Sequence, residues 1–205
     1  MVSETYISFI SKLQKLFNFF GFKLQNKRII KIRIDRPSLQ YFYELKKGSL
    51  ITGVELGAWK GDNAEKIYRL FNIKKLYLVD AWDSSITKEG ILRDQYDFNN
   101  IKIKVLGRFA FNKEIKIIDD FSVDAINKIK EKVDFVYIDT SHDYETTRDE
   151  LRLYFPIVKK GGMIAGHDIE NRPEKENGVF KAVSEFALKN NLKVYLKSPD
   201  WWIMK

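Results

Sequence analysis

From residue 50 onward, short apolar runs alternate with amphipathic helical segments, and this alternation limits the folds open to the chain. Apolar runs typical of buried strands lie at 50–56, 75–79, 115–118, 134–138 and 162–165. Segments with apolar residues at helical spacing lie between or after them, at 62–71, 123–129, 144–155 and 178–189. Strands that alternate with helices predict an α/β fold with a doubly wound, mostly parallel sheet.

The last part of the sequence departs from this alternation of strands and helices. Two further strand-like runs, 193–197 and 201–204, are separated only by Ser198-Pro199-Asp200. A connection of three residues allows antiparallel pairing but is too short for a parallel crossover. We therefore expect a seven-stranded sheet that is parallel except at its C-terminal strand.

The first 49 residues differ from the rest in charge. Residues 1–50 hold ten Lys and Arg against Glu4, Asp35 and Glu44, which leaves +7 of the total of +8. We expect residues 1–49 to form a basic, amphipathic N-terminal extension, with a helix over 7–20, a strand over 28–34 and a helix over 38–47. Residues 50–205 would form the main domain, and its near-neutral charge disfavours nucleic acid as a partner.

Two interpretations of residues 1–36 stay open. The helix packs on the body or on a second subunit of a homo-oligomer, or the segment lies on an anionic membrane as a peripheral contact. No apolar run approaches the ~18 residues of a membrane span, and no signal peptide is evident. A cytoplasmic protein, peripheral at a membrane in the second case, is therefore expected. The absence of Cys excludes a Cys-ligated zinc site and a thiol nucleophile.

A glycine-rich turn follows the first strand of the main domain. Gly57 and Gly61 bracket the step into the next helix, and Glu55 precedes them. Trp59 replaces the second glycine of a dinucleotide-binding turn, and no Lys-Ser/Thr pair follows as in a phosphate loop. Acidic neighbours favour a cationic ligand, although an ordinary tight turn would use the same residues.

The second strand ends at Asp80, 23 residues after Gly57. An acid at this place commonly accepts hydrogen bonds from both ribose hydroxyls of an adenosyl ligand. A helix N-cap is the alternative role for Asp80.

The pattern Glu55-x-Gly57-x-x-x-Gly61, the acid at 80 and the antiparallel last strand together resemble class I S-adenosylmethionine-dependent methyltransferases over residues 50–205. The stretches DFVYIDTSHDY (134–144) and KGGMIAGHD (160–168) are similar to the small-molecule and sugar O-methyltransferases, which include macrolide-sugar methyltransferases. The resemblance implies S-adenosylmethionine as cofactor and a small hydroxylated or sugar-like acceptor. It also implies that Asp120 and Phe121 lie around the cofactor, although both could simply begin a helix. Trp82 is expected near the cofactor because it follows Asp80.

Asp139 and Asp168 end neighbouring strands of the expected sheet. Carboxylates that converge there suit Mg²⁺ or another divalent cation, and Asp139 would also lie against the cofactor. His142, three residues beyond Asp139, is a candidate general base, as the resemblance also implies. The sugar methyltransferases have consecutive acids where this chain has His167-Asp168, so the third metal ligand is His167, Glu170 or none. Alternatively, His142 caps a helix and the two acids anchor backbone N–H groups.

Two other functions stay open. The chain could methylate a macromolecule such as RNA or protein, or it could bind an adenosyl group or nucleotide without catalysis. Residues 84–111 show no clear period. They are expected to form a lid or a substrate loop over the pocket.

Overall fold

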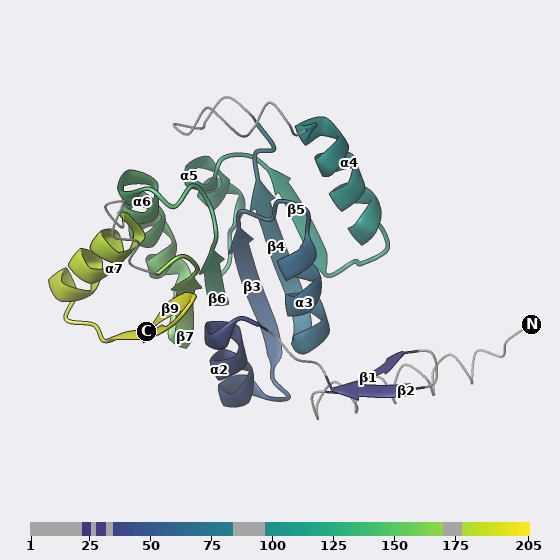
Figure 1. Ribbon diagram of the computed structural model, residues 1–205, viewed down its shortest axis with the longest axis horizontal. Coiled ribbons are helices and arrows are strands. Elements are labelled where there is room, and N and C mark those ends of the chain that lie inside the picture. The colour runs from purple at the N-terminus through teal and green to yellow at the C-terminus, as the bar shows by residue number, and fades with distance from the viewer. Residues whose placement is uncertain (1–21, 26–27, 32–34, 84–96, 170–177) are drawn as a thin grey trace, which may run out of the picture.

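The structure is a computed structural model, and it describes residues 22–25, 28–31, 35–83, 97–169 and 178–205. Its centre is a seven-stranded sheet in the order β5-β4-β3-β6-β7-β9-β8, with helices on both faces (Figure 1). Five strands are parallel: β3 (Leu50–Leu56), β4 (Asn72–Asp80), β5 (Ile115–Asp119), β6 (Val133–Ile138) and β7 (Val158–Gly166).

The last two strands form the antiparallel part of the sheet. β9 (Asp200–Met204) lies between β7 and β8 (Val194–Lys197) and runs antiparallel to both. The predicted fold class is therefore confirmed: a Rossmann-like, mostly parallel sheet with an antiparallel C-terminal strand.

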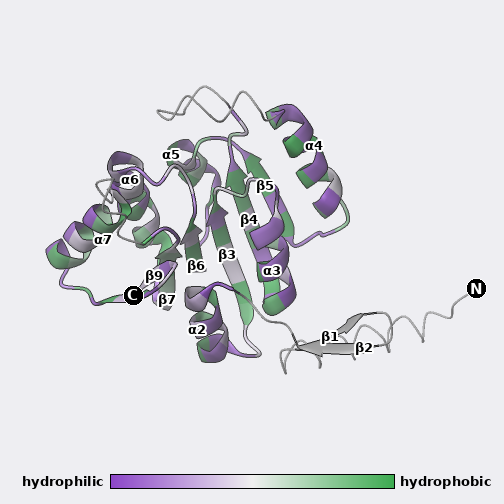
Figure 2. Cartoon of the chain, viewed as in Figure 1, coloured by the Kyte–Doolittle hydropathy of each residue, from purple (hydrophilic) through white to green (hydrophobic). Residues whose placement is uncertain are grey.

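Each face of the sheet has its own apolar core. One core contains side chains of α2 (Pro37–Lys46), α3 (Asp62–Leu70) and α4 (Phe98–Phe109). The other contains side chains of α5 (Ser122–Ala125), α6 (Tyr144–Tyr154) and α7 (Gly178–Lys189). Two single-turn 3-10 helices, Ile126–Lys128 and Phe155–Ile157, continue α5 and α6. Figure 2 shows hydrophobic colour along the central strands and mixed colour on the helices, as expected for amphipathic helices that cover a sheet.

Helix α2 belongs to the core, although its residues fall within the range assigned to the N-terminal extension. Leu39 and Phe42 have no exposed surface, and the Phe42 ring lies 5.9 Å from the ring of Phe135 on β6. The helix is also tied to the last strand, because Ser38 donates from its backbone N (3.0 Å) and its hydroxyl (2.5 Å) to Oδ2 of the buried Asp200. Helix α2 and strand β9 are thus joined directly by hydrogen bonds.

The segment before α2 is only partly described. β1 (Phe22–Gln25) and β2 (Arg28–Lys31) form a separate antiparallel pair, so the predicted strand at 28–34 is present over its first four residues. The predicted helix over 7–20 lies outside the described residues. In the part of the chain that the structure describes, no helix is long and apolar enough to cross a membrane.

The expectation of an irregular segment over 84–111 is wrong for its second half, which contains α4. The side chain of Asp97 caps this helix by accepting from the backbone N of Asn100 (2.9 Å). The sequence pattern does not indicate this helix because apolar residues occur on its exposed face as well as on its buried face. Ile103 is 66% and Leu106 is 43% exposed. Residues 84–96, the rest of the expected lid, lie outside the described residues.

Candidate active site

Four residues at the carboxyl edge of the sheet have a positive φ angle, which is uncommon for residues other than glycine. The φ angles are 46° at Trp59, 42° at Trp82, 59° at His142 and 58° at Asp168. Each of these residues follows the end of a parallel strand: β3, β4, β6 and β7. Such conformations raise the free energy of the chain and tend to occur where function requires a particular geometry. They mark this edge as the candidate site.

The glycine-rich turn after β3 passes very close to the end of β6. Gly57 has φ 85°, and a Cβ at this position would lie 1.9 Å from the backbone O of Asp139. Gly61 has φ 79°, and a Cβ there would lie 2.8 Å from the Phe109 ring of α4. Both glycines are therefore required by the fold. The predicted turn also lies directly beside the predicted acid.

Asp80 organises this turn from the end of β4. Its Oδ2 accepts from the backbone N of Trp59 and its Oδ1 from that of Trp82, both at 2.8 Å. The indole Nε1 of Trp82 then donates to the backbone O of Trp59 at 2.9 Å. In the described chain Asp80 thus holds two loops together and does not cap a helix. Its contact with ribose stays a prediction.

Glu55 is the most deeply buried acid of the cofactor set. Its side chain is 1% exposed, and its Oε1 accepts from Nδ2 of Asn63 at 2.8 Å. Its Oε2 is buried without a hydrogen-bond partner among the described residues. Burial raises the pKa of Glu55 to about 8, and the negative charge of Asp139 adds to this effect. Glu55 is therefore mostly protonated at neutral pH.

Asp120 and Phe121 lie beside Asp80, at the end of β5. The backbone N of Asp120 donates to the backbone O of Asp80 at 3.1 Å. The Asp120 carboxylate accepts from the backbone N of Phe121 (2.9 Å) and pairs with Lys128 (2.8 Å). Phe121 is the residue before α5, so both residues also fit the alternative of a helix start. Their predicted adenine contact is untested.

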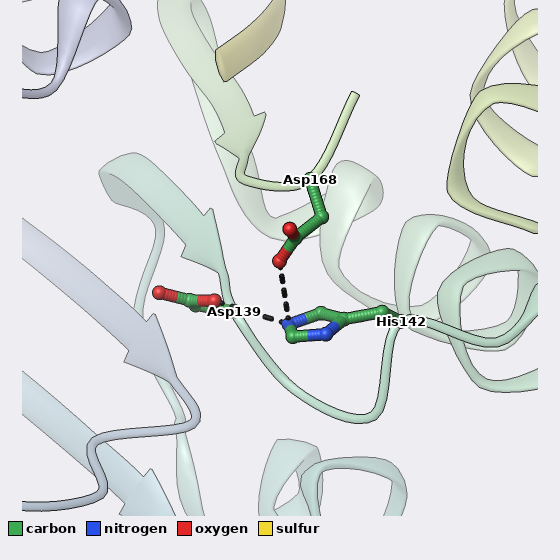
Figure 3. A group of neighbouring side chains, drawn as sticks. All are labelled: Asp139, His142 and Asp168. Carbon is green, nitrogen blue, oxygen red and sulfur yellow. Dashed lines mark hydrogen bonds and ion pairs between the residues drawn. The ribbon is translucent and has the colours of Figure 1, made fainter. Parts of the chain in front are cut away.

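The structure brings together the two predicted catalytic residues, Asp139 and His142, and the predicted metal ligand Asp168 (Figure 3). Asp139, His142 and Asp168 offer ligand atoms that all lie within 4.8 Å of one another. Nε2 of His142 lies 3.2 Å from Oδ1 of Asp139 and 3.0 Å from Oδ2 of Asp168. We call these residues the Asp-His-Asp cluster. Asp139 and Asp168 are 29 residues apart in the sequence, and the fold places both carboxylates in contact with the same imidazole.

The imidazole of His142 takes its electrostatic character from its neighbours. Burial alone would lower its pKa, but the hydrogen bond to Asp139 and the charge of Asp168 raise it above the ordinary value. Behind the loop, Oε2 of the fully buried Glu150 accepts from Oγ1 of Thr140 at 3.0 Å. Burial raises the pKa of Glu150 to about 7. The loop that carries His142 is thus hydrogen-bonded to a buried carboxyl group that the sequence analysis did not identify.

His142 does not cap α6. That role belongs to Asp143, whose Oδ1 accepts from the backbone N of Thr146 at 2.9 Å. His167 touches the cluster from outside, with Nδ1 2.9 Å from Oδ2 of Asp168, and is not one of the three grouped residues. Glu170, the other candidate third ligand, lies outside the described residues.

Arg36 is a neighbour of the cluster that the sequence did not reveal. It precedes α2, and one of its guanidinium nitrogens lies 3.7 Å from Oδ2 of Asp139. Its Nε is buried without a hydrogen-bond partner among the described residues. The adjacent Asp35 pairs with Lys66 of α3 at 2.6 Å, so the chain before α2 is held close to the site. No local signal in the sequence could have shown this contact, because it joins residues 103 positions apart.

A comparison with models of known protein families gives evidence independent of this geometry. The family model of a methyltransferase domain matches residues 54–169, which is more than half of the chain. The chain belongs to this methyltransferase family. The matched range contains every described member of the predicted site, from Glu55 to Asp168. It also spans the carboxyl-edge loops just described.

Similar structures agree with this assignment at the level of the fold. The O-methyltransferase NovP superposes with a TM-score of 0.61 at 14% identity, over 82% of this chain and 79% of NovP. MycE, a methyltransferase of the mycinamycin pathway solved with Mg, SAH and mycinamycin VI, gives a TM-score of 0.56 at 14% identity. That match covers 82% of this chain and 48% of MycE.

A relative detected by sequence comes from a giant virus. An uncharacterized protein of Acanthamoeba polyphaga mimivirus is 23% identical over 140 residues. The match covers 66% of this methyltransferase chain and 60% of the viral protein. The chain thus spans less than two thirds of the length of that relative.

The residues present fit the groups that the methyltransferase fold implies. The carboxylates of Asp139 and Asp168, whose oxygens lie within 4.8 Å of each other and of the His142 imidazole, suit a hard divalent cation that keeps water or substrate oxygens as further ligands, and His142 then stays available as a base. Gly57, which has no side chain, and the carboxylate of Asp80 suit the close approach of a ligand that carries a positive sulfonium.

Proposed function

We propose that this methyltransferase domain transfers a methyl group from S-adenosylmethionine to a hydroxyl of a small molecule or sugar-like acceptor, with the help of a divalent cation. The main observation behind the proposal is that the Asp-His-Asp cluster lies next to the glycine-rich turn, because Gly57 contacts the backbone of Asp139. A base, two metal-binding carboxylates and a cofactor turn at one edge suit deprotonation of a hydroxyl beside a methyl donor.

The cofactor would lie across the turn between Glu55 and Gly61. A carboxylate oxygen accepts more than one hydrogen bond. Asp80 can therefore hold its two backbone amides and the ribose hydroxyls together. Asp120 and Phe121, next to Asp80 on the neighbouring strand, would contact adenine, and Trp82 would bound the pocket.

The chemistry requires one proton transfer and one displacement. The acceptor hydroxyl gives its proton to Nε2 of His142, while its oxygen forms a bond to the methyl carbon. The bond between this carbon and the sulfonium sulfur breaks, and its electron pair stays on sulfur. The products are a methyl ether and S-adenosylhomocysteine (SAH). A divalent cation held by Asp139 and Asp168 would lower the pKa of the hydroxyl.

The similar structures support the acceptor class. NovP is described as an O-methyltransferase, and MycE was solved with Mg, SAH and mycinamycin VI. These properties belong to those proteins. They agree with a small hydroxylated acceptor, but rRNA methylases match the fold as well, with TM-scores of 0.54. The near-neutral charge of residues 51–205 is what favours a small molecule over RNA.

The test is SAH release from S-adenosylmethionine with a panel of hydroxylated acceptors, in Mg²⁺ or in EDTA. His142→Ala should lower the rate ~10²–10⁴-fold and leave SAH affinity nearly unchanged. His167→Ala is the matched control and should lose much less. Equal rates for His142→Ala and the native protein would show that His142 is not the general base. SAH binding without turnover would favour the non-catalytic module, and turnover only on RNA or protein would favour the macromolecular acceptor.

A further inference from the structure

The edge of the sheet opposite the active site is rich in lysine. The residues concerned come from the C-terminal turn of α2, the starts of β4, β6 and β7, and the end of the antiparallel β9. All these positions lie at the amino-terminal edge of the parallel strands. We call them the amino-edge lysines: Lys46, Lys47, Lys74, Lys75, Lys130, Lys132, Lys159, Lys160 and Lys205.

Printed contacts show that several of these ammonium groups lie close together. Nζ of Lys132 and Nζ of Lys205 both donate to the backbone O of Pro156, at 2.8 and 3.1 Å. Nζ of Lys46 lies 3.7 Å from the place of a Cβ at Gly161, whose backbone N donates to the backbone O of Lys205. Burial and the nearby charge of Lys132 lower the pKa of Lys205. The positive charges therefore act on one another and on any common partner.

Carboxylates at this edge are fewer than lysines, and two of them already have hydrogen-bond or ion-pair partners. Glu131 pairs with Lys75. Asp134 accepts from Lys159 and from the backbone N of Thr52, both at 2.8 Å. The described edge also includes Glu44 and Glu114. Nine lysines against four acids leave a clear positive excess at an edge of a domain whose total charge is close to neutral.

Two exposed leucines lie among the lysines. Leu45, in the last turn of α2, is 53% exposed, and Leu50, the first residue of β3, is 56% exposed. The phosphate backbone of a nucleic acid offers nothing apolar for such side chains. Lysines also outnumber the arginines at this edge, which are Arg69 and Arg152 in the last turns of α3 and α6. Lysines act as compact point charges and lack the planar fork with which arginine recognises individual phosphates. This combination favours a diffuse anionic surface with an apolar interior.

We propose that the amino-terminal edge docks on an anionic lipid bilayer. The amino-edge lysines would face the headgroup phosphates, and Leu45 and Leu50 would reach the acyl boundary. The proposal does not rest on the proposed function. Strands of seven to nine residues separate the two edges by roughly 20–30 Å. The docked protein would therefore turn its active edge away from the bilayer, toward water-soluble acceptors.

The experiment is co-sedimentation of the full chain with phosphatidylcholine vesicles, with and without phosphatidylserine, at about 0.1 M and about 0.5 M salt. Binding should require phosphatidylserine and fall at high salt. The double variant Lys47→Glu/Lys160→Glu should bind at least ~25-fold more weakly, since each lysine neutralised near the surface lowers binding about fivefold. The matched control is Lys104→Glu/Lys181→Glu, which makes the same charge change on α4 and at the start of α7. It should bind nearly like the native chain.

Two further measurements complete the test. Leu45→Ser should weaken the binding that remains at high salt, and SAH affinity should be unchanged in all variants, which shows that they are folded. Equal losses in the two double variants would overturn the proposal, because net charge alone would then explain binding. Binding to a homopolymeric RNA but not to phosphatidylserine vesicles would also overturn it, in favour of a nucleic-acid surface. Residues 1–36 are present throughout, so their own attraction to lipid cancels in the comparison.

Discussion

Replacing Glu55 by glutamine should change how the stability of the fold depends on pH. Glu55 is buried, with a pKa of about 8 in the folded protein against 4.5 for the free group. Its contribution to stability is therefore fully present below pH 4.5 and is lost as the pH rises toward 8, because the unfolded chain ionises freely and the folded one does not.

The magnitude follows from the proton difference between the two states. Over most of this window the unfolded state holds one proton fewer at Glu55, so the native free energy of unfolding falls by about 1.4 kcal/mol per pH unit relative to the Glu55→Gln variant. Across the whole window the difference is on the order of 3–5 kcal/mol. The amide oxygen of the variant side chain can still accept from Asn63, but its buried N–H groups add a cost of about 1–3 kcal/mol that does not depend on pH.

The slope is therefore the quantity to measure. Urea unfolding of the native chain and of Glu55→Gln between about pH 5 and pH 8 gives the difference in unfolding free energy at each pH. His142 titrates in both proteins and cancels in the difference. Parallel profiles, with a constant offset, would refute the reasoning, because they would mean that Glu55 is ionised in the folded protein.

Four further results are expected. Phe42→Ala should lower the unfolding free energy by about 3–5 kcal/mol in urea, because α2 belongs to the core; a loss below ~1 kcal/mol would show that it is a dispensable appendage. Gly57→Ala should impair folding, seen as a lower melting temperature, because its Cβ would meet the backbone O of Asp139; an unchanged melting temperature would contradict this contact. Asp80→Ala should weaken SAH binding about tenfold or more in calorimetry, and equal affinity would remove Asp80 from the site. Asp139→Asn should abolish the dependence of the rate on divalent cations, whereas full native activity in EDTA would remove the metal from the mechanism.

The sheet could be predicted because its strands carry their own signal. Runs such as 135–138 are apolar along their whole length, as expected for strands buried on both faces, and the two-residue connection between β8 and β9 allows only antiparallel pairing. Helix α4 was missed for the opposite reason. Exposed Ile103 and Leu106 surround its buried stripe, so local periodicity does not distinguish the two faces.

Much of the candidate site could be predicted because topology places it. Because acids that end adjacent parallel strands lie at the same edge of a sheet, the sequence alone predicts that Asp139 and Asp168 lie close together. Arg36 and Glu150 could not be found in this way. Their places depend on how a helix packs against the sheet, and this depends on side-chain fit across long sequence separations.

The hydrogen bonds from Ser38 to Asp200 close a loop of 162 residues. For a flexible chain, bringing such distant ends together carries an entropy cost of about 4–5 kcal/mol, and the buried carboxylate recovers part of this only when both ends are folded. The amide proton of Ser38 is therefore a single reporter on both ends of the domain. Its hydrogen exchange should follow that of β9 and not that of the neighbouring turns of α2, so that one resonance reveals whether the domain opens from its ends or as a unit.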